Sequence, residues 1–160
     1  PWFEGGTGNP SSSHLFGRSA KEAIERAREQ LARMLEASPD EIYFTAGGTE
    51  SNNLILRGIA EAKGAGHLVT AATEHPSVLR TCRYLEERGL SLTVVGVDRE
   101  GRVDPSEVEA ALRPDTFLVT IMRANNEVGT LQDIRAIGDI VRPRGVLLHT
   151  DAAQYIGKHP

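Results

Sequence analysis

Residues 67–97 read HLVTAATEHPSVLRTCRYLEERGLSLTVVGV, and this stretch carries the pattern that decides the fold. His67–Ala71 and Leu90–Val97 are predicted strands, because each is a short run rich in apolar and β-branched residues. Between them, Pro76–Arg88 has apolar side chains at helical spacing, begins with proline and is followed by glycine. A strand, a helix and a strand joined by short connections predict a βαβ unit with parallel strands.

The same alternation continues on both sides of this unit. Asp104-Pro105 is a strong helix start, since aspartate caps the first turn and proline fits its first position. The whole pattern predicts an α/β fold with a mainly parallel sheet and helices on both faces. The other predicted helices cover Arg18–Glu36, Thr49–Lys63 and Asp133–Arg142, and the other predicted strands cover Ile42–Thr45, Thr116–Met122 and Gly145–Thr150.

The composition narrows the class of protein. The 160 residues are 39% apolar and 25% charged, with a net charge of -4 and a mean hydropathy of -0.30, which is typical of a soluble globular domain. The sequence has no obvious basic face of the kind that indicates nucleic-acid binding, and no apolar run in it is long enough to span a membrane. The single cysteine, Cys82, excludes a disulfide within the chain and favours a reducing, cytoplasmic location. The scattered histidines predict no metal site.

Polar clusters follow four of the predicted strands. They are Ala46–Glu50, Thr73–His75, Asn125–Glu127 and Asp151–Gln154. Ligands of open parallel sheets bind outside the carboxyl ends of the strands, so these clusters predict one site.

Each cluster has a chemical interpretation and a structural one. The turn Gly47-Gly48-Thr49 could hold a phosphate at a helix start, or be an ordinary turn. Asp151 could face a protonated ring nitrogen, or cap a helix or pair with an arginine. His75 could stack on a flat ring or move protons, although a lone histidine is more often structural. Asn126 could bind a ligand or serve the turn. For Cys82 we prefer the structural interpretation, a half-buried helical thiol.

Taken together, five segments resemble the cysteine desulfurase and selenocysteine lyase family of fold-type I pyridoxal-phosphate enzymes, which are similar to class V aminotransferases. The segments appear in family order and close to family spacing. They read NPSSSH at 9–14, FTAGGTESNN at 44–53, TEH at 73–75, NNEVG at 125–129 and HTDAAQ at 149–154.

The resemblance implies pyridoxal 5'-phosphate as cofactor. Gly48 and Thr49 would hold its phosphate, and His75 would stack on the pyridine ring and act as the catalytic proton carrier. Asp151 would keep the ring nitrogen protonated, so that the ring acts as an electron sink. Gln154 would donate a hydrogen bond to the phenolic oxygen.

The resemblance also implies a reaction and partners. L-cysteine would give L-alanine and an enzyme-bound persulfide, and Asn126 would help hold the substrate carboxylate. The sulfur would pass to an acceptor protein for iron–sulfur cluster assembly and other sulfur-transfer pathways. The parent enzyme would be a homodimer.

By the same resemblance, residues 1–160 would be part of a pyridoxal-phosphate-binding large domain. The N-terminal strand, the segment with the Schiff-base lysine and the small C-terminal domain would lie outside it. Lys158 follows Gln154 too closely to be that lysine. We therefore expect this chain alone to be inactive.

Two alternatives stay open. A selenocysteine lyase would share all these segments. A nucleotide-binding module or a non-catalytic α/β scaffold is the alternative of another class. A nucleotide binder should show a glycine fingerprint with an acidic residue about 20 positions later, which this sequence lacks.

Overall fold

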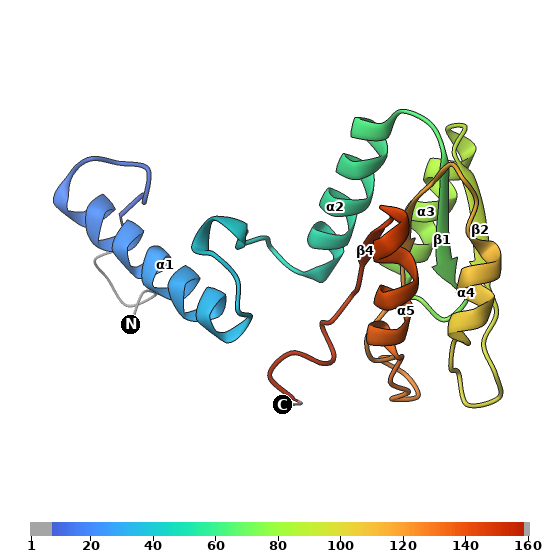
Figure 1. Cartoon of the computed structure of the whole chain (residues 1–160). Coiled ribbons are helices and arrows are strands. Elements are labelled where there is room, and N and C mark those ends of the chain that lie inside the picture. Colours follow the sequence, from blue (N-terminus) through green and yellow to red (C-terminus); the bar gives the residue numbers. More distant parts are fainter. Residues whose placement is uncertain (1–7, 159–160) are drawn as a thin grey trace. The chain divides into compact units, whose positions relative to one another are not determined.

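The computed structural model describes residues 8–158 and divides the chain into two units, Pro1–Thr45 and Ala46–Pro160 (Figure 1). Residues 1–7 and 159–160 of the expected 1–160 domain lie outside the described residues. The four predicted polar clusters all belong to the second unit.

The first unit is built on helix α1, Leu15–Met34. This helix begins three residues before the predicted start at Arg18, because His14 acts as its N-cap. The ring Nδ1 of His14 accepts a hydrogen bond from the backbone N–H of Gly17 at 3.2 Å. Serine, threonine, aspartate and asparagine are the usual residues at this position, so the histidine cap gave no sequence signal.

The predicted strand Ile42–Thr45 is wrong. A short 3₁₀ helix, η1, spans Pro39–Glu41, and the residues after it are not part of a strand. The guanidinium group of Arg28 donates a hydrogen bond to the carbonyl oxygen of Ile42 and lies 5.1 Å from the centre of the Phe44 ring. The Arg28 side chain therefore satisfies a carbonyl group that would otherwise pair with a neighbouring strand. The apolar, β-rich composition of this run was not sufficient to predict a strand.

The second unit contains a four-stranded sheet in the order β2-β1-β3-β4, and all three neighbouring pairs are parallel. This confirms the predicted parallel sheet. No strand is longer than predicted, and β2 and β4 are each three residues shorter, since a ladder ends where the chains diverge. The strands are β1, His67–Ala71; β2, Ser91–Val95; β3, Thr116–Thr120; and β4, Leu147–His149.

Two helices of this unit begin at aspartate caps: Asp104 was predicted as a cap, whereas Asp133 was predicted as the first helical residue and is the N-cap instead. Asp104 accepts a hydrogen bond from the N–H of Ser106, and Asp133 accepts one from Ala136, so each carboxylate satisfies a free donor of its first turn. The helices are α2, Gly48–Lys63; α3, Pro76–Glu87; α4, Pro105–Ala111; α5, Ile134–Val141; and the 3₁₀ helix η2, Arg142–Arg144.

Side chains alternate between the two faces of the sheet, and helices cover both faces (Figure 1). On one face, Leu68 of β1 and Leu118 of β3 pack with residues of α2 and α3. On the other face, Val69 and Val119 pack with residues of α4 and α5. All four strand residues are fully buried. The prediction of helices on both faces is therefore confirmed.

The strand order reverses at β1. The chain passes from β1 to β2 on one side, and then returns to place β3 on the other side of β1. Right-handed crossovers in opposite directions put their helices on opposite faces, which explains why α3 and α4 lie apart. Such a reversal opens a crevice at the carboxyl ends of β1 and β3, where ligands of this fold class bind.

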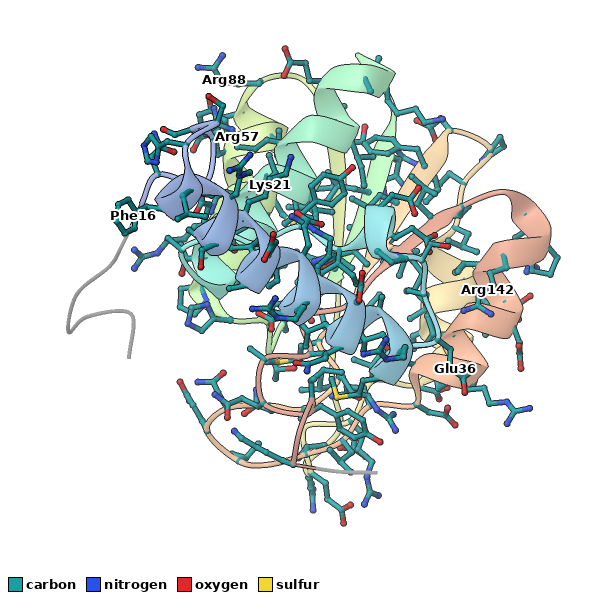
Figure 2. The ribbon with its side chains drawn as sticks, turned by 90° about the vertical axis from the view of Figure 1, so that its left-hand side faces the viewer. Phe16, Lys21, Glu36, Arg57, Arg88 and Arg142 are labelled. Carbon is teal, nitrogen blue, oxygen red and sulfur yellow. The ribbon has the colours of Figure 1, made fainter. Side chains whose placement is uncertain are left out.

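Helices α2 and α3 are joined at the surface by an aromatic contact. The Tyr84 ring of α3 lies between two guanidinium groups, with Arg57 of α2 at 5.2 Å and Arg88 at 4.6 Å from its centre. Figure 2 labels both arginines, which lie close together at one end of the unit. Cations over an aromatic face are attracted by its electron density, so this stack helps to hold α2 beside α3.

We predict that Cys82 is a core residue and not a reactive thiol. Its side chain is fully buried between α3 and the sheet, and burial raises the pKa of the thiol to about 12. In the native full protein, Cys82 should resist a colorimetric thiol reagent and should react after unfolding. Cys82→Ser should leave activity intact. Peptide mapping that finds Cys82 modified in the native state at the rate of the unfolded chain would contradict this.

Candidate functional site

A pocket of about 200 Å³ lies at the carboxyl ends of the strands, and all six predicted site residues line it. The structure thus brings together side chains that are up to 106 positions apart in the sequence. The predicted residues are Gly48, Thr49, His75, Asn126, Asp151 and Gln154, and the other lining residues are Ser77, Met122, Ala124 and Ala153.

One wall of the pocket is the first turn of α2. The first N–H groups of a helix have no partner within it, and they carry partial positive charge. Here the N-cap is Gly47, which has no side chain to cap them, and Gly48 and Thr49 follow. The Glu50 carboxylate turns away, since its Oε2 accepts from the N–H of Ala46 at 2.6 Å. This turn can bind an anion through two backbone N–H groups and the Thr49 hydroxyl.

Asp151 also lines the pocket and follows β4, with Thr150 between them. Its Oδ1 accepts a hydrogen bond from the N–H of Ala153 at 3.0 Å, and its Oδ2 accepts one from Nδ2 of Asn52 at 2.8 Å. These two donors fix the orientation of the half-buried carboxyl group. Asp151 can therefore present a negative charge to a ligand in the pocket.

Asn52 was missed as a functional residue by the sequence analysis. Its side chain is 3% exposed, and its Nδ2 also donates to the Ser77 hydroxyl at 2.9 Å. One amide thus links α2, the start of α3 and the end of β4. The only signal was its place in the stretch AGGTESNN, which does not indicate that residue 52 points inward beside Asp151.

His75 is the N-cap of α3. Its Nδ1 accepts from the N–H of Ser77 at 3.1 Å and lies 2.7 Å from the Ser77 hydroxyl. A neutral ring that accepts at Nδ1 carries its proton on Nε2. The ring is half-buried and lines the pocket. His75 therefore has a structural role as a helix cap, and its ring is also placed where it can contact a ligand.

The remaining predicted residues lie on the open side. Asn125 holds its loop, since Nδ2 donates to the carbonyl of Thr73 at 3.0 Å and Oδ1 accepts from the N–H of Glu127 at 2.9 Å. Its neighbour Asn126 is exposed and can contact a ligand. Gln154 is also exposed, and its Oε1 accepts from Nζ of Lys158 at 2.5 Å.

These residues fit pyridoxal 5'-phosphate. The group needs an anion site for its phosphate, a flat partner for its ring and a carboxylate for its ring nitrogen. The α2 start, the His75 ring and Asp151 offer these three features around one pocket, and the small side chains of Ala124 and Ala153 leave room between them.

Two other kinds of site find no support in the described part of the chain. Among residues 8–158 no group of three or more His, Cys, Asp or Glu could hold a metal ion. No helix within the same range has the length and apolar character needed for crossing a bilayer.

We predict that Asn52 orients Asp151. Asn52→Asp would place a second carboxylate against Oδ2 of Asp151 and remove its donor, so it should destabilise the full protein by about 1–3 kcal/mol at pH 8. The loss should shrink at pH 5, where a carboxyl group of the pair can hold a proton. Urea unfolding at both pH values measures this, with Asn53→Asp, one position along the same helix, as the control. An equal loss at both pH values would contradict the assignment.

The whole chain, residues 1–160, matches the family described as aminotransferase class-V. It is 51% identical over 158 residues to the cysteine desulfurase IscS of Pseudomonas syringae pv. tomato, covering 97% of this chain and 39% of the relative. It is 49% identical over 161 residues to the cysteine desulfurase IscS of Escherichia coli O139:H28, covering 99% of this chain and 40% of that relative.

Solved structures show the same likeness. SspA in complex with cysteine superimposes with a TM-score of 0.95 at 43% identity, covering 99% of this chain and 46% of that one. DndA from Streptomyces lividans superimposes with a TM-score of 0.85 at 42% identity, covering 94% of this chain and 43% of that one.

The chain therefore spans less than half the length of the relatives it matches. The match to the family nevertheless extends from the first residue to the last, and it includes every segment that forms the pocket. This chain belongs to the aminotransferase class V family.

Proposed function

We propose that the chain is part of a pyridoxal-phosphate-dependent cysteine desulfurase, which converts L-cysteine to L-alanine and keeps the sulfur as a persulfide on an enzyme cysteine. The observation that carries this proposal is the pocket in which the α2 start, His75 and Asp151 meet. The identity of 47–51% to proteins named cysteine desulfurase supports the same activity. The segments outside this chain would supply the lysine that holds the cofactor and the cysteine that takes the sulfur.

The residues of the pocket would share the work of holding the cofactor. The N–H groups of Gly48 and Thr49 and the Thr49 hydroxyl would bind its phosphate. The Asp151 carboxylate, oriented by Asn52, would hold a proton on the ring nitrogen. Gln154 would bind the phenolic oxygen. When bound, the cofactor supplies an electron sink for charge that develops on the substrate.

The His75 ring and Asn126 would act on the substrate side. With Nδ1 of His75 engaged by Ser77, its Nε2–H is the position from which a proton can be given and taken. Asn126, exposed beside the pocket, would help to bind the carboxylate of the amino acid.

We further propose a sulfur-acceptor protein as partner, a homodimer as the working form and the cytoplasm as location. The one cysteine of this chain is a buried thiol, which is consistent with a reducing compartment. One structural neighbour, SspA, is in complex with cysteine, the same substrate that we propose here. L-selenocysteine is the alternative substrate, and rates measured on both amino acids decide between them.

We predict that Asp151→Asn lowers turnover of the full enzyme by about 100-fold or more, because a neutral amide cannot stabilise a protonated ring nitrogen. Cofactor binding should persist, since the phosphate turn is unchanged. Sulfide release from L-cysteine, with a reductant present, measures the loss. Asp133→Asn, which changes an exposed helix cap in the same unit, is the matched control. Near-normal turnover in the Asp151 variant would refute the role of this carboxylate.

We also predict that the 160-residue chain expressed alone releases no sulfide from L-cysteine. Its lysines are Lys21, Lys63 and Lys158, and only Lys158 is close in sequence to the pocket. Lys158 is exposed and donates to Gln154, which is itself proposed to bind the cofactor. Sulfide release by the chain alone, together with a borohydride-stable cofactor adduct mapped to Lys158, would overturn this prediction.

A further inference from the structure

Glu74 is a buried carboxyl group for which the proposed function has no task. It precedes His75 and is 6% exposed, although glutamate is rarely buried without a paired charge. Its Oε1 accepts a hydrogen bond from the N–H of Met122 at 2.6 Å, whereas within residues 8–158 its Oε2 is buried without a hydrogen-bond partner.

The bond from Met122 lies at the reversal of strand order. Thr70 of β1 and Thr120 of β3 are the last paired residues of the two strands. Beyond them the chains separate around the crevice, and the Glu74 side chain bridges the gap to Met122. The two ends that it joins carry His75 and Met122, which both line the pocket.

We propose that Glu74 is a positioning residue, whose carboxyl group ties the end of β1 to the end of β3 and so fixes His75 and Met122 against the cofactor. The proposal rests on the proposed function, because it concerns the same pocket. The amide of Asn125, which donates to the Thr73 carbonyl at 3.0 Å, makes a second tie across the same crevice.

The geometry also indicates that the carboxyl group of Glu74 holds a proton. An ionised carboxylate needs several donors when it is buried, and Glu74 has one, whereas the more exposed Asp151 has two. The pKa of Glu74 is raised to about 8, chiefly by burial and to a smaller extent by the charge of Asp151, while the bond from Met122 acts in the opposite direction. Glu74, enclosed by the protein and held by one donor, is thus assigned as a neutral acid at neutral pH.

The other titratable groups near Glu74 do not alter this assignment. Cys82 of α3 is one of them, and the pKa of that thiol is raised to about 12, so it carries no charge at neutral pH. His75 is the adjacent residue and has its Nδ1 occupied by Ser77. The effect of pH follows: the folded-state pKa of Glu74 exceeds its ordinary value, so its contribution to stability is lost as pH rises through about 8.

The test compares Glu74→Gln and Glu74→Leu in the full protein. Glutamine is neutral, has nearly the same shape and keeps an oxygen for the Met122 N–H, whereas leucine leaves that buried donor unpaired. Titration of the cofactor-free protein with pyridoxal phosphate at pH 7 should give wild-type affinity for Glu74→Gln and about tenfold weaker binding for Glu74→Leu.

Gln132→Leu is the matched control. Gln132 is 1% exposed, and its Oε1 accepts from the N–H of Val103 at 2.9 Å, so leucine there also leaves a buried backbone donor unpaired. Gln132 does not line the pocket. It should lose stability, as Glu74→Leu does, and keep its affinity for the cofactor. Equal loss of affinity in both leucine variants, or undiminished affinity in Glu74→Leu, would overturn the positioning role.

The pH dependence supplies a readout that purely structural damage would not change. Between pH 7 and pH 9 the affinity of wild type relative to Glu74→Gln should fall by up to about tenfold, because one unit above its pKa a group is nine-tenths ionised. Urea unfolding of the cofactor-free proteins should show the same divergence in stability. An affinity ratio that stays constant between pH 7 and pH 9, together with stabilities of the two proteins that change in parallel, would refute the assignment of Glu74 as a neutral acid. If no form binds the cofactor, the proposed function fails, while unfolding still decides the protonation of Glu74.

Discussion

The order β2-β1-β3-β4 is the constraint on which the candidate site depends. Since all four strands are parallel, their carboxyl ends lie along one edge, and the segments that leave them are brought together. The reversal beside β1 separates the segment that leads to His75 from the segment that leads to Asn126. A ligand can therefore enter between the two segments. Without the reversal of strand order, the two segments would leave the sheet toward the same face and no crevice would separate them.

Side-chain hydrogen bonds then convert this crevice into a defined pocket. Asn52 reaches both Ser77 and Asp151, and Glu74 reaches Met122, so segments far apart in the chain are held at fixed positions. The charges are arranged by the same bonds. Asp151 accepts from two donors and lines the pocket with the α2 start, whereas Glu74 accepts from one donor and is buried.

Much of this architecture could be predicted from the sequence. Strong local signals, such as the cap Asp104 and the alternating strand and helix patterns, predicted the second unit and its parallel sheet. The run Ile42–Thr45 has a strand-like composition, yet Arg28 binds its first carbonyl, and no local pattern reveals such a contact. The early start of α1 depends on a histidine cap, which propensities do not favour.

The site shows the same division. Its lining residues follow strands and could be found from that position, because the edge of the sheet gathers them. The roles of Asn52 and Glu74 could not be found in this way, since they depend on partners 99 and 48 positions away. Nothing in the local sequence distinguishes Glu74 from an exposed glutamate, and only the packed structure shows that its carboxyl group is enclosed.

We propose above that this pocket holds pyridoxal phosphate with Asp151 against a protonated ring nitrogen. Nitrogen NMR of the full protein, loaded with cofactor labelled at the ring nitrogen, observes that atom directly. We expect the chemical shift of a protonated pyridine nitrogen in wild type and the shift of an unprotonated nitrogen in Asp151→Asn. An unprotonated nitrogen in wild type, or the same shift in both proteins, would contradict it.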